Sequence, residues 1–175
     1  MRHFMALCLA ALFPLGLRAA APATWYYLGE AKLSSADGKP LGSQVILLEK
    51  THDPEKATIT ERAVIVKPDG KAEEQTMLLT VRDDNTFTLA DAAKTVEGSG
   101  ALFGPAWAWT AFKGTFRHKS GVVVVDENFM ADDSVITARK RVSGPDGKVL
   151  TYMDMSLKAV TPKTFEILTA GLLKK

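Results

Sequence analysis

Histidine and serine, the residue types that most often carry proton transfer and nucleophilic attack, show no catalytic spacing in this chain. His52 and His118 are the only histidines beyond the N-terminal segment, and both fall in expected loops. The segment Glu97-Gly98-Ser99-Gly100 lacks the first glycine of a Gly-x-Ser-x-Gly turn, so we expect a flexible link or a bulge there. We predict no catalytic residues and rank an enzyme third among the functions considered.

Acidic side chains gather at two groups of expected turns, where carboxylates could bind a cation. Calcium needs several oxygen ligands from a loop of defined spacing and zinc needs at least three ligands, and neither pattern is present. We therefore predict no metal and no cofactor, and we interpret both groups as solvated turns. Their members are Glu49, Asp53 and Glu55 in one half and Asp126, Glu127, Asp132 and Asp133 in the other.

Two tryptophans lie close together in the most aromatic stretch of the chain. Trp107 and Trp109 are separated by one alanine, so in the strand expected here both rings fall on one face. They would either line the mouth of an apolar cavity or pack in the core of the domain.

Two arginines are the charged candidates for ligand binding. If Arg62 and Arg139 face the interior, their planar guanidinium groups suit a carboxylate or phosphate head group. If they face solvent, we expect them to pair with Glu49 and Asp126 or with neighbouring acids.

The first 23 residues have the order of a cleavable export signal. Arg2 is followed by an apolar run from Phe4 to Leu17 and by small residues that end at Ala23, after which we expect cleavage. A membrane anchor is the alternative, but about 14 apolar residues are fewer than the ~20 that span a bilayer. We predict an exported protein, periplasmic or extracellular, whose single domain covers residues 24–175 without an integral membrane segment.

Charge and cysteine content narrow the range of partners. The chain has 22 Lys and Arg against 20 Asp and Glu, and loss of Arg2 and Arg18 leaves 20 of each, so no nucleic-acid partner is expected. Cys8 is the only cysteine and lies within the signal, so the mature domain would form no disulfide.

Short alternating runs separated by Gly, Pro, Asp and Asn predict an all-β domain with connections of hairpin length. In the turns Pro68-Asp69-Gly70-Lys71 and Pro145-Asp146-Gly147-Lys148, Pro sets φ, Asp bonds its own turn and Gly takes a positive φ. The expected strands are residues 24–33, 43–50, 57–67, 71–82, 85–90, 95–103, 107–117, 121–130, 134–143, 148–160 and 163–170.

These two turns are 77 residues apart and mark an internal repeat. After the turns the matching spacing becomes 78, so we expect one extra residue, a β-bulge, in the second copy, because without it the side chains would change faces. Two roughly five-stranded meanders, about residues 24–90 and 107–168, are thus predicted. The matches are Ile46 to Glu49 with Val123 to Asp126, Ile59 to Arg62 with Ile136 to Arg139, Met77 with Met155, and Phe87 with Phe165.

Two such meanders can join at both edges or pack face to face. Joining gives a single antiparallel up-and-down β-barrel of about ten strands and removes exposed edges, so we prefer it to a two-sheet β-sandwich. Ten strands make a barrel wider than the eight that side chains just fill, which predicts an internal cavity. Besides the two tryptophans and two arginines, its expected lining is Val45, Leu47, Ile59, Ile65, Met77, Leu79, Phe87, Phe112, Val122, Val124, Val142, Met153, Met155, Leu157 and Phe165.

An exported chain of ten short meander strands resembles the calycin type of β-barrel, which includes the lipocalins and fatty-acid-binding proteins. It is most similar to small exported bacterial barrels of unassigned function. The Gly-x-Trp of lipocalins is absent near Trp25, and the loop from Ser34 to Gly42 is too short for the helical lid of fatty-acid-binding proteins. The resemblance implies a binding barrel and leaves the ligand open.

These expectations lead to an exported, non-catalytic barrel that binds a small apolar or amphipathic molecule, such as a lipid, in its cavity. The alternative is a structural or interaction module of the cell envelope that works through its outer surface, because Val122 to Val125 is apolar on both strand faces. The volume and lining of the interior distinguish these functions.

Overall fold

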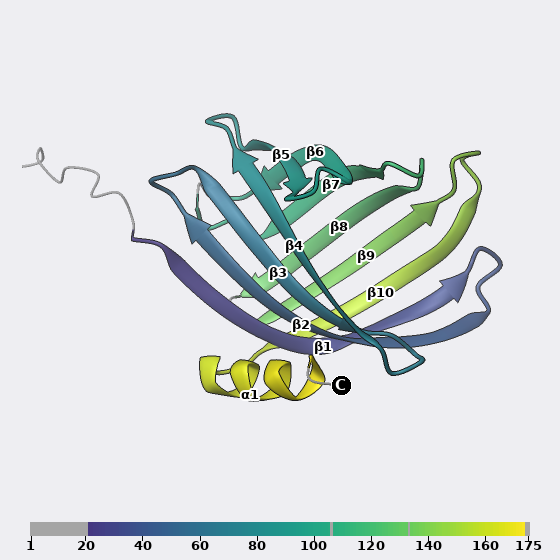
Figure 1. Cartoon of the computed structure of the whole chain (residues 1–175). Coiled ribbons are helices and arrows are strands. Elements are labelled where there is room, and N and C mark those ends of the chain that lie inside the picture. Colours follow the sequence, from purple (N-terminus) through teal and green to yellow (C-terminus); the bar gives the residue numbers. More distant parts are fainter. Residues whose placement is uncertain (1–20, 106, 133, 174–175) are drawn as a thin grey trace, which may run out of the picture.

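A computed structural model describes residues 21–105, 107–132 and 134–173; residues 1–20, where the export signal is expected, lie outside the described residues. The described strands form one closed antiparallel barrel, in which each strand pairs with its neighbours in sequence and β1 pairs with β10 (Figure 1). The predicted up-and-down barrel is confirmed, and the sandwich is wrong. The strands are β1 (Ala23–Ser35), β2 (Pro40–Asp53), β3 (Thr58–Val66), β4 (Ala72–Val81), β5 (Thr86–Asp91), β6 (Val96–Phe103), β7 (Ala111–His118), β8 (Val123–Asp132), β9 (Val135–Ser143) and β10 (Val149–Ala159).

Both Pro-Asp-Gly turns form as predicted. Gly70 and Gly147 have φ angles of 80° and 79°, in the left-handed region that glycine enters without steric cost. The carboxylates of Asp69 and Asp146 each accept a hydrogen bond of 3.1 Å from the backbone N–H two residues later. The two turns are therefore equivalent in conformation as well as in sequence.

The extra residue of the second copy is also where the repeat places it. Across β10 and β9, Val149 pairs with Ser143 but Thr151 pairs with Val142, so Leu150 is inserted as a bulge. The corresponding strands β3 and β4 pair without such a shift. This confirms the predicted change in spacing from 77 to 78 residues.

Strands β2 and β8, however, correspond one residue differently from the prediction. Lys50 pairs with Glu61, and Asn128 pairs with Ala138. Glu61 and Ala138 are 77 residues apart, whereas Lys50 and Asn128 are 78 apart, and a register shift near the end of β8 absorbs the difference. A shift of one residue exchanges the faces of a strand, so the predicted match of these strands is wrong.

That shift moves several side chains to the face opposite the expected one. Val45 is 43% exposed and Leu47 lies on the outer wall, although both were expected to line the cavity. Asp126, expected in a solvated turn, lies inside the barrel and is 4% exposed.

The last described element is a helix, α1 (Pro162–Leu172), so the strand predicted at residues 163–170 is wrong. The hydroxyl of Thr161 accepts a hydrogen bond from the backbone N–H of Thr164 at 3.2 Å, and Pro162 lies in the first turn, where no donor is needed. This cap favours a helix over the strand that the repeat implies. Among the described residues, no helix is long and apolar enough to cross a lipid bilayer.

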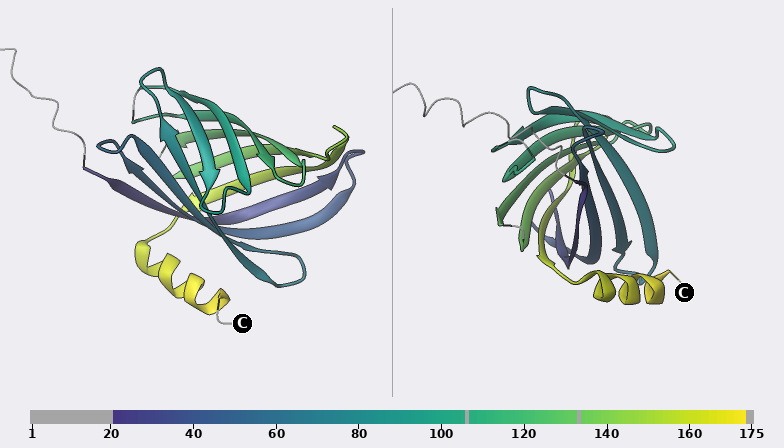
Figure 2. Two further views of the ribbon diagram at one scale, coloured as in Figure 1. Left: turned by 45° about the horizontal axis from the view of Figure 1, so that its top comes forward. Right: turned by 90° about the vertical axis from the view of Figure 1, so that its left-hand side faces the viewer.

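Helix α1 covers an apolar patch on the outer wall of the barrel. Phe165 is 2% exposed and packs against Leu47 of β2 and Val64 of β3, and its ring centroid lies 5.1 Å from that of Tyr26. Figures 1 and 2 show the helix lying outside the strands. Phe165 therefore shields the outer wall instead of lining the lumen.

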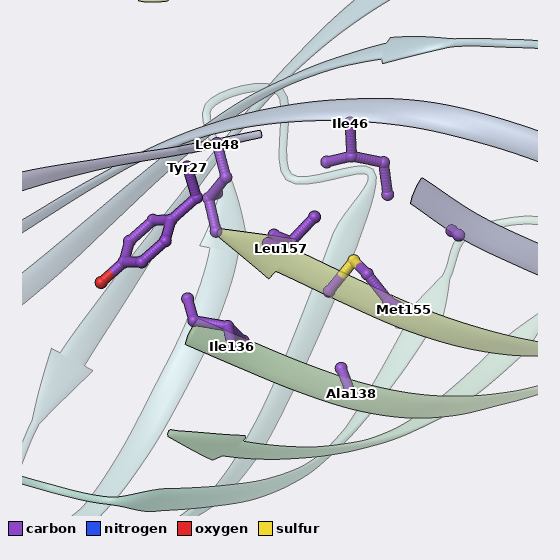
Figure 3. Close-up of a cluster of buried hydrophobic side chains, with 8 residues drawn as sticks. Tyr27, Ile46, Leu48, Ile136, Ala138, Met155 and Leu157 are labelled. Carbon is purple, nitrogen blue, oxygen red and sulfur yellow. The ribbon is translucent and has the colours of Figure 1, made fainter. Parts of the chain in front are cut away.

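Inside the barrel, apolar side chains from the first and last strands meet. Tyr27 and Leu48 point toward Ile136 and Leu157 in one buried cluster (Figure 3). Because these residues come from β1, β2, β9 and β10, the cluster stabilises the closure between the two ends of the sheet.

The glycine segment around Ser99 lies within strand β6 and pairs on both sides without a shift in register, so the expected flexible link or bulge is wrong. A Cβ atom would lie 2.5 Å from Phe116 Cδ1 at Gly98 and 2.5 Å from Phe87 Cζ at Gly100. Glycine at these inward positions makes room for two phenylalanine rings.

Replacement of Phe165 by alanine should lower the free energy of unfolding by about 3 kcal/mol, because it opens the contact between α1 and the barrel. Chemical denaturation followed by circular dichroism measures this. Ile167→Ala on the same helix, where the side chain is 62% exposed, is the matched control and should change stability by less than about 0.5 kcal/mol. Equal effects of the two variants would contradict a docked helix.

Candidate ligand-binding cavity

The interior of the barrel contains a cavity of about 300 Å³, lined by side chains from β2 to β10. This volume is at the lower end of the range for small-molecule sites. Gln44, Gln75 and His118 line it near the β1–β2, β3–β4 and β7–β8 hairpins, and His118 is exposed there. We call this side of the barrel the open end.

Aromatic rings close the opposite side. Trp25 and His52 have ring centroids 4.8 Å apart, and the rings of Trp107 and Trp109 are 4.9 Å apart. His52 connects the two pairs, with centroids 6.4 Å from Trp107 and 5.9 Å from Trp109. These four residues form what we call the aromatic plug.

The two predicted tryptophans reach the plug from a loop and not from a strand. Strand β7 begins only at Ala111, and Trp107 has a φ of 62°, in the left-handed region that a bulky residue rarely adopts. The indole N–H of Trp109 donates a hydrogen bond to Asn85 at 3.1 Å, and this ring lines the main cavity. Trp107 lines a smaller adjoining pocket of about 90 Å³ together with Trp25 and His52.

Four of the other predicted residues line the main cavity: Met77, Met153, Met155 and Phe112. Phe87 is fully buried and stacks on Phe112 with a centroid distance of 4.9 Å, so it supports the wall without reaching the open space. The walls are thus formed largely by thioether and aromatic side chains, which adapt to apolar ligands of different shapes.

Both predicted arginines lie outside the cavity. Arg62 pairs with Glu74 at 2.7 Å and, as predicted, with Glu49 at 3.3 Å. Arg139 pairs at 2.9 Å with Asp154, not with Asp126, which faces the other side of the sheet. Neither guanidinium group is placed to bind a head group in the lumen.

The charged groups that do line the cavity are two ion pairs on opposite halves of the chain. Lys50 Nζ lies 3.3 Å from Glu61 Oε1, between β2 and β3. Lys140 Nζ lies 2.8 Å from Asp126 Oδ2, between β9 and β8, and the Asp126 side chain is only 5% exposed. An apolar interior alone would not hold two ion pairs, since removing charges from water is costly unless they are paired.

The second pair leaves polar atoms without partners. Asp126 Oδ1 and Asn128 Oδ1 are buried and have no hydrogen-bond partner among the described residues. An unsatisfied buried acceptor costs about 1–3 kcal/mol. Burial raises the pKa of Asp126; burial also acts to lower the pKa of Lys140, but the charges of Asp126 and Glu61 outweigh it and raise that pKa.

His52 in the aromatic plug is a further buried polar group. Its side chain is 8% exposed, and neither ring nitrogen has a hydrogen-bond partner in the described part of the chain. Burial, helped by the nearby charge of Lys50 and opposed by Glu61, lowers the pKa of His52 to about 4. The imidazole is therefore neutral at physiological pH and faces both the main cavity and the smaller pocket.

The sequence analysis missed these polar residues because it considered only apolar alternation. Lys50 and His52 continue the inward positions of Ile46 and Leu48, and Glu61 lies two residues after the inward Ile59. Following the two-residue period through polar residues would have found them.

The described residues do not bring three or more His, Asp or Glu side chains together in a metal-binding arrangement. The cavity therefore presents apolar walls, two paired charges and free acceptors. That chemistry suits binding, in which a ligand supplies the missing hydrogen bonds.

The chain matches no protein-family model and no curated protein sequence. Its structure is similar to a protein of unknown function of the DUF3598 family from Nostoc punctiforme (TM-score 0.58, 9% identity) and to an S-type phycobiliprotein lyase from Guillardia theta (TM-score 0.56, 10% identity). Each likeness covers 78% of this chain, with 88% of the lyase but only 47%, about half, of the DUF3598 protein. It shows the fold alone and supports the predicted calycin-like barrel at that level.

The lowered pKa of His52 predicts an acid-sensitive fold. As pH falls from 6.5 to about 4, the unfolded chain takes up a proton on His52 while the folded chain does not, so the free energy of unfolding should decrease by up to about 3 kcal/mol. Above pH 6.5 this residue should have no effect. Denaturation curves across this range measure the change.

His52→Leu should reduce that loss of stability, because the unfolded variant no longer takes up this proton. His118→Gln, which alters an exposed histidine at the open end, is the control and should keep the His52-dependent loss. An unchanged pH profile in His52→Leu would disprove the assignment.

Proposed function

We propose that this protein is an exported, non-catalytic barrel that binds one small, mostly apolar molecule in its lumen. The observation that carries the proposal is the cavity of about 300 Å³, in which apolar walls surround buried acceptors that have no partner among the described residues. Such a combination is typical of ligand sites, where a few polar groups orient a mainly apolar molecule.

The lining supports a ligand of modest size. A water molecule takes about 30 Å³ in the liquid, so this volume corresponds to roughly ten waters, or a ligand with a similar number of non-hydrogen atoms. Met77, Met153 and Met155 can change rotamer to accept chains or rings of somewhat different shape. The aromatic plug restricts access to the open end.

Export belongs to the proposal because of the charged, apolar and small-residue order of the first 23 residues. Sequencing the N-terminus of protein purified from a bacterial periplasm tests it, and Thr24 is the expected first residue. The fold shared with a phycobiliprotein lyase is compatible with a binding barrel, but a likeness of 10% identity transfers no activity.

The alternative function, through the outer surface, rests on a smaller observation. Phe103 and Phe129 are 50% and 57% exposed, and both lie opposite Ala111 in the pairing of β6, β7 and β8. Helix α1 already covers the apolar patch on β2 and β3. A module that works through its surface needs no internal cavity, so the lumen favours ligand binding.

Ligand binding predicts that the neutral fluorescent probe N-phenyl-1-naphthylamine quenches tryptophan emission, because Trp109 lines the cavity. Ala63→Phe places a ring in the lumen and should weaken binding at least about tenfold, which is the effect of losing about 1.4 kcal/mol. Fluorescence titration measures this, and native mass spectrometry of the purified protein detects any bound lipid.

Thr76→Phe adds the same ring to an exposed position on β4 and is the matched control. It should bind the probe like the unaltered protein. Absence of quenching and of any co-purified molecule, or equal weakening by both variants, would reject the cavity as the binding site.

A further inference from the structure

We propose that the cavity selects a neutral apolar molecule bearing a hydroxyl group, such as an alcohol, and discriminates against the free carboxylic acid of the same chain length. This inference rests on the proposed function and adds the chemistry of the ligand's polar end. It concerns the two ion pairs and the free acceptors beside them.

The recognition site consists of Asp126, Asn128 and Lys140. Asp126 and Asn128 occupy successive inward positions of β8, and the register places Lys140 of β9 directly opposite Asp126. The free atoms Asp126 Oδ1 and Asn128 Oδ1 are both acceptors, so what they lack is a donor. A bound molecule satisfies them only by offering an O–H or N–H group.

The charge balance of the lumen opposes an ionised ligand. Among the described residues that line the cavity, the charged side chains beyond the histidines are Lys50, Glu61, Asp126 and Lys140. They form two complete ion pairs, at 3.3 Å and 2.8 Å, so no full charge is left without a counter-ion. A carboxylate would enter with an uncompensated charge and would meet the oxygens of Asp126 and Asn128, while an ammonium group would meet two lysines.

A hydroxyl group fits this arrangement because it donates and accepts at once. It can donate to Asp126 Oδ1 and accept from the ammonium group of Lys140, which has three N–H donors and one ion-pair partner in the described structure. A carboxylate has no proton to donate near neutral pH. The apolar part of the ligand then lies along Met153, Met155 and Phe112, which line the same cavity.

The test compares two probes that differ only at the polar end, 1-decanol and decanoate, by isothermal titration calorimetry at pH 7.5 with the full-length mature protein. Decanol should bind at least about tenfold more tightly, the factor expected for one hydrogen bond to a charged group. Decanoate binding as tightly or more tightly would overturn the inference and leave the proposed function intact. If neither probe nor N-phenyl-1-naphthylamine binds, the proposed function itself fails.

Asp126→Asn provides a second readout, because it leaves the positive charge of Lys140 without its partner. The preference should shift toward decanoate by about tenfold or more, as expected when a buried charge gains a counter-ion. Glu127→Gln changes the net charge equally on the outer face of β8, where Glu127 pairs with Lys113 at 2.6 Å, and should leave the preference unchanged. Equal shifts in both variants would overturn the inference.

Glu61→Gln is the substitute if Asp126→Asn does not fold. It removes the other interior carboxylate and leaves Lys50 unpaired, so it should also shift the preference toward decanoate. The comparison of the two probes on the unaltered protein needs no variant and decides the inference in either case.

Discussion

Closure of the sheet by pairing β1 with β10 is the constraint on which the rest of this structure depends. It removes every free strand edge from the described barrel and fixes the number of strands that surround the lumen. Because ten strands enclose more space than side chains fill, an interior cavity follows from the strand count. Tyr27 and Leu48 on one side and Ile136 and Leu157 on the other provide the apolar contact that holds this seam together.

Two irregularities of one residue decide which side chains see that space. Leu150 near the start of β10 and the register shift near the end of β8 each change the alternation of faces along the chain. Without the second, the strand that carries Asp126 would correspond to β2 as the sequence spacing implies, and the carboxylate would face solvent like Glu49. The polarity of the lumen is therefore set by backbone register as much as by composition.

Local signals in the sequence were sufficient for much of the fold. The Pro-Asp-Gly turns and the repeat determine the hairpins, the barrel and the bulge at Leu150, because turn chemistry and two-residue alternation act over short distances. The site was less predictable: Met77, Met153 and Met155 were found as apolar inward residues, whereas Lys50 and Lys140 look like ordinary surface lysines until the opposite wall is placed. Phe165 was misassigned because the cap at Thr161 and Pro162 overrides the resemblance to Phe87.

The pairing of the first strand with the last also sets the order in which the chain can fold. Hairpins such as β3–β4 form from neighbouring residues, but β1 has no second partner until β10 exists, more than a hundred residues later. Until then the growing sheet has two open edges, and its lumen residues are in water. Closure is thus the step with the greatest loop entropy, and it is the one that turns a curved sheet into a container.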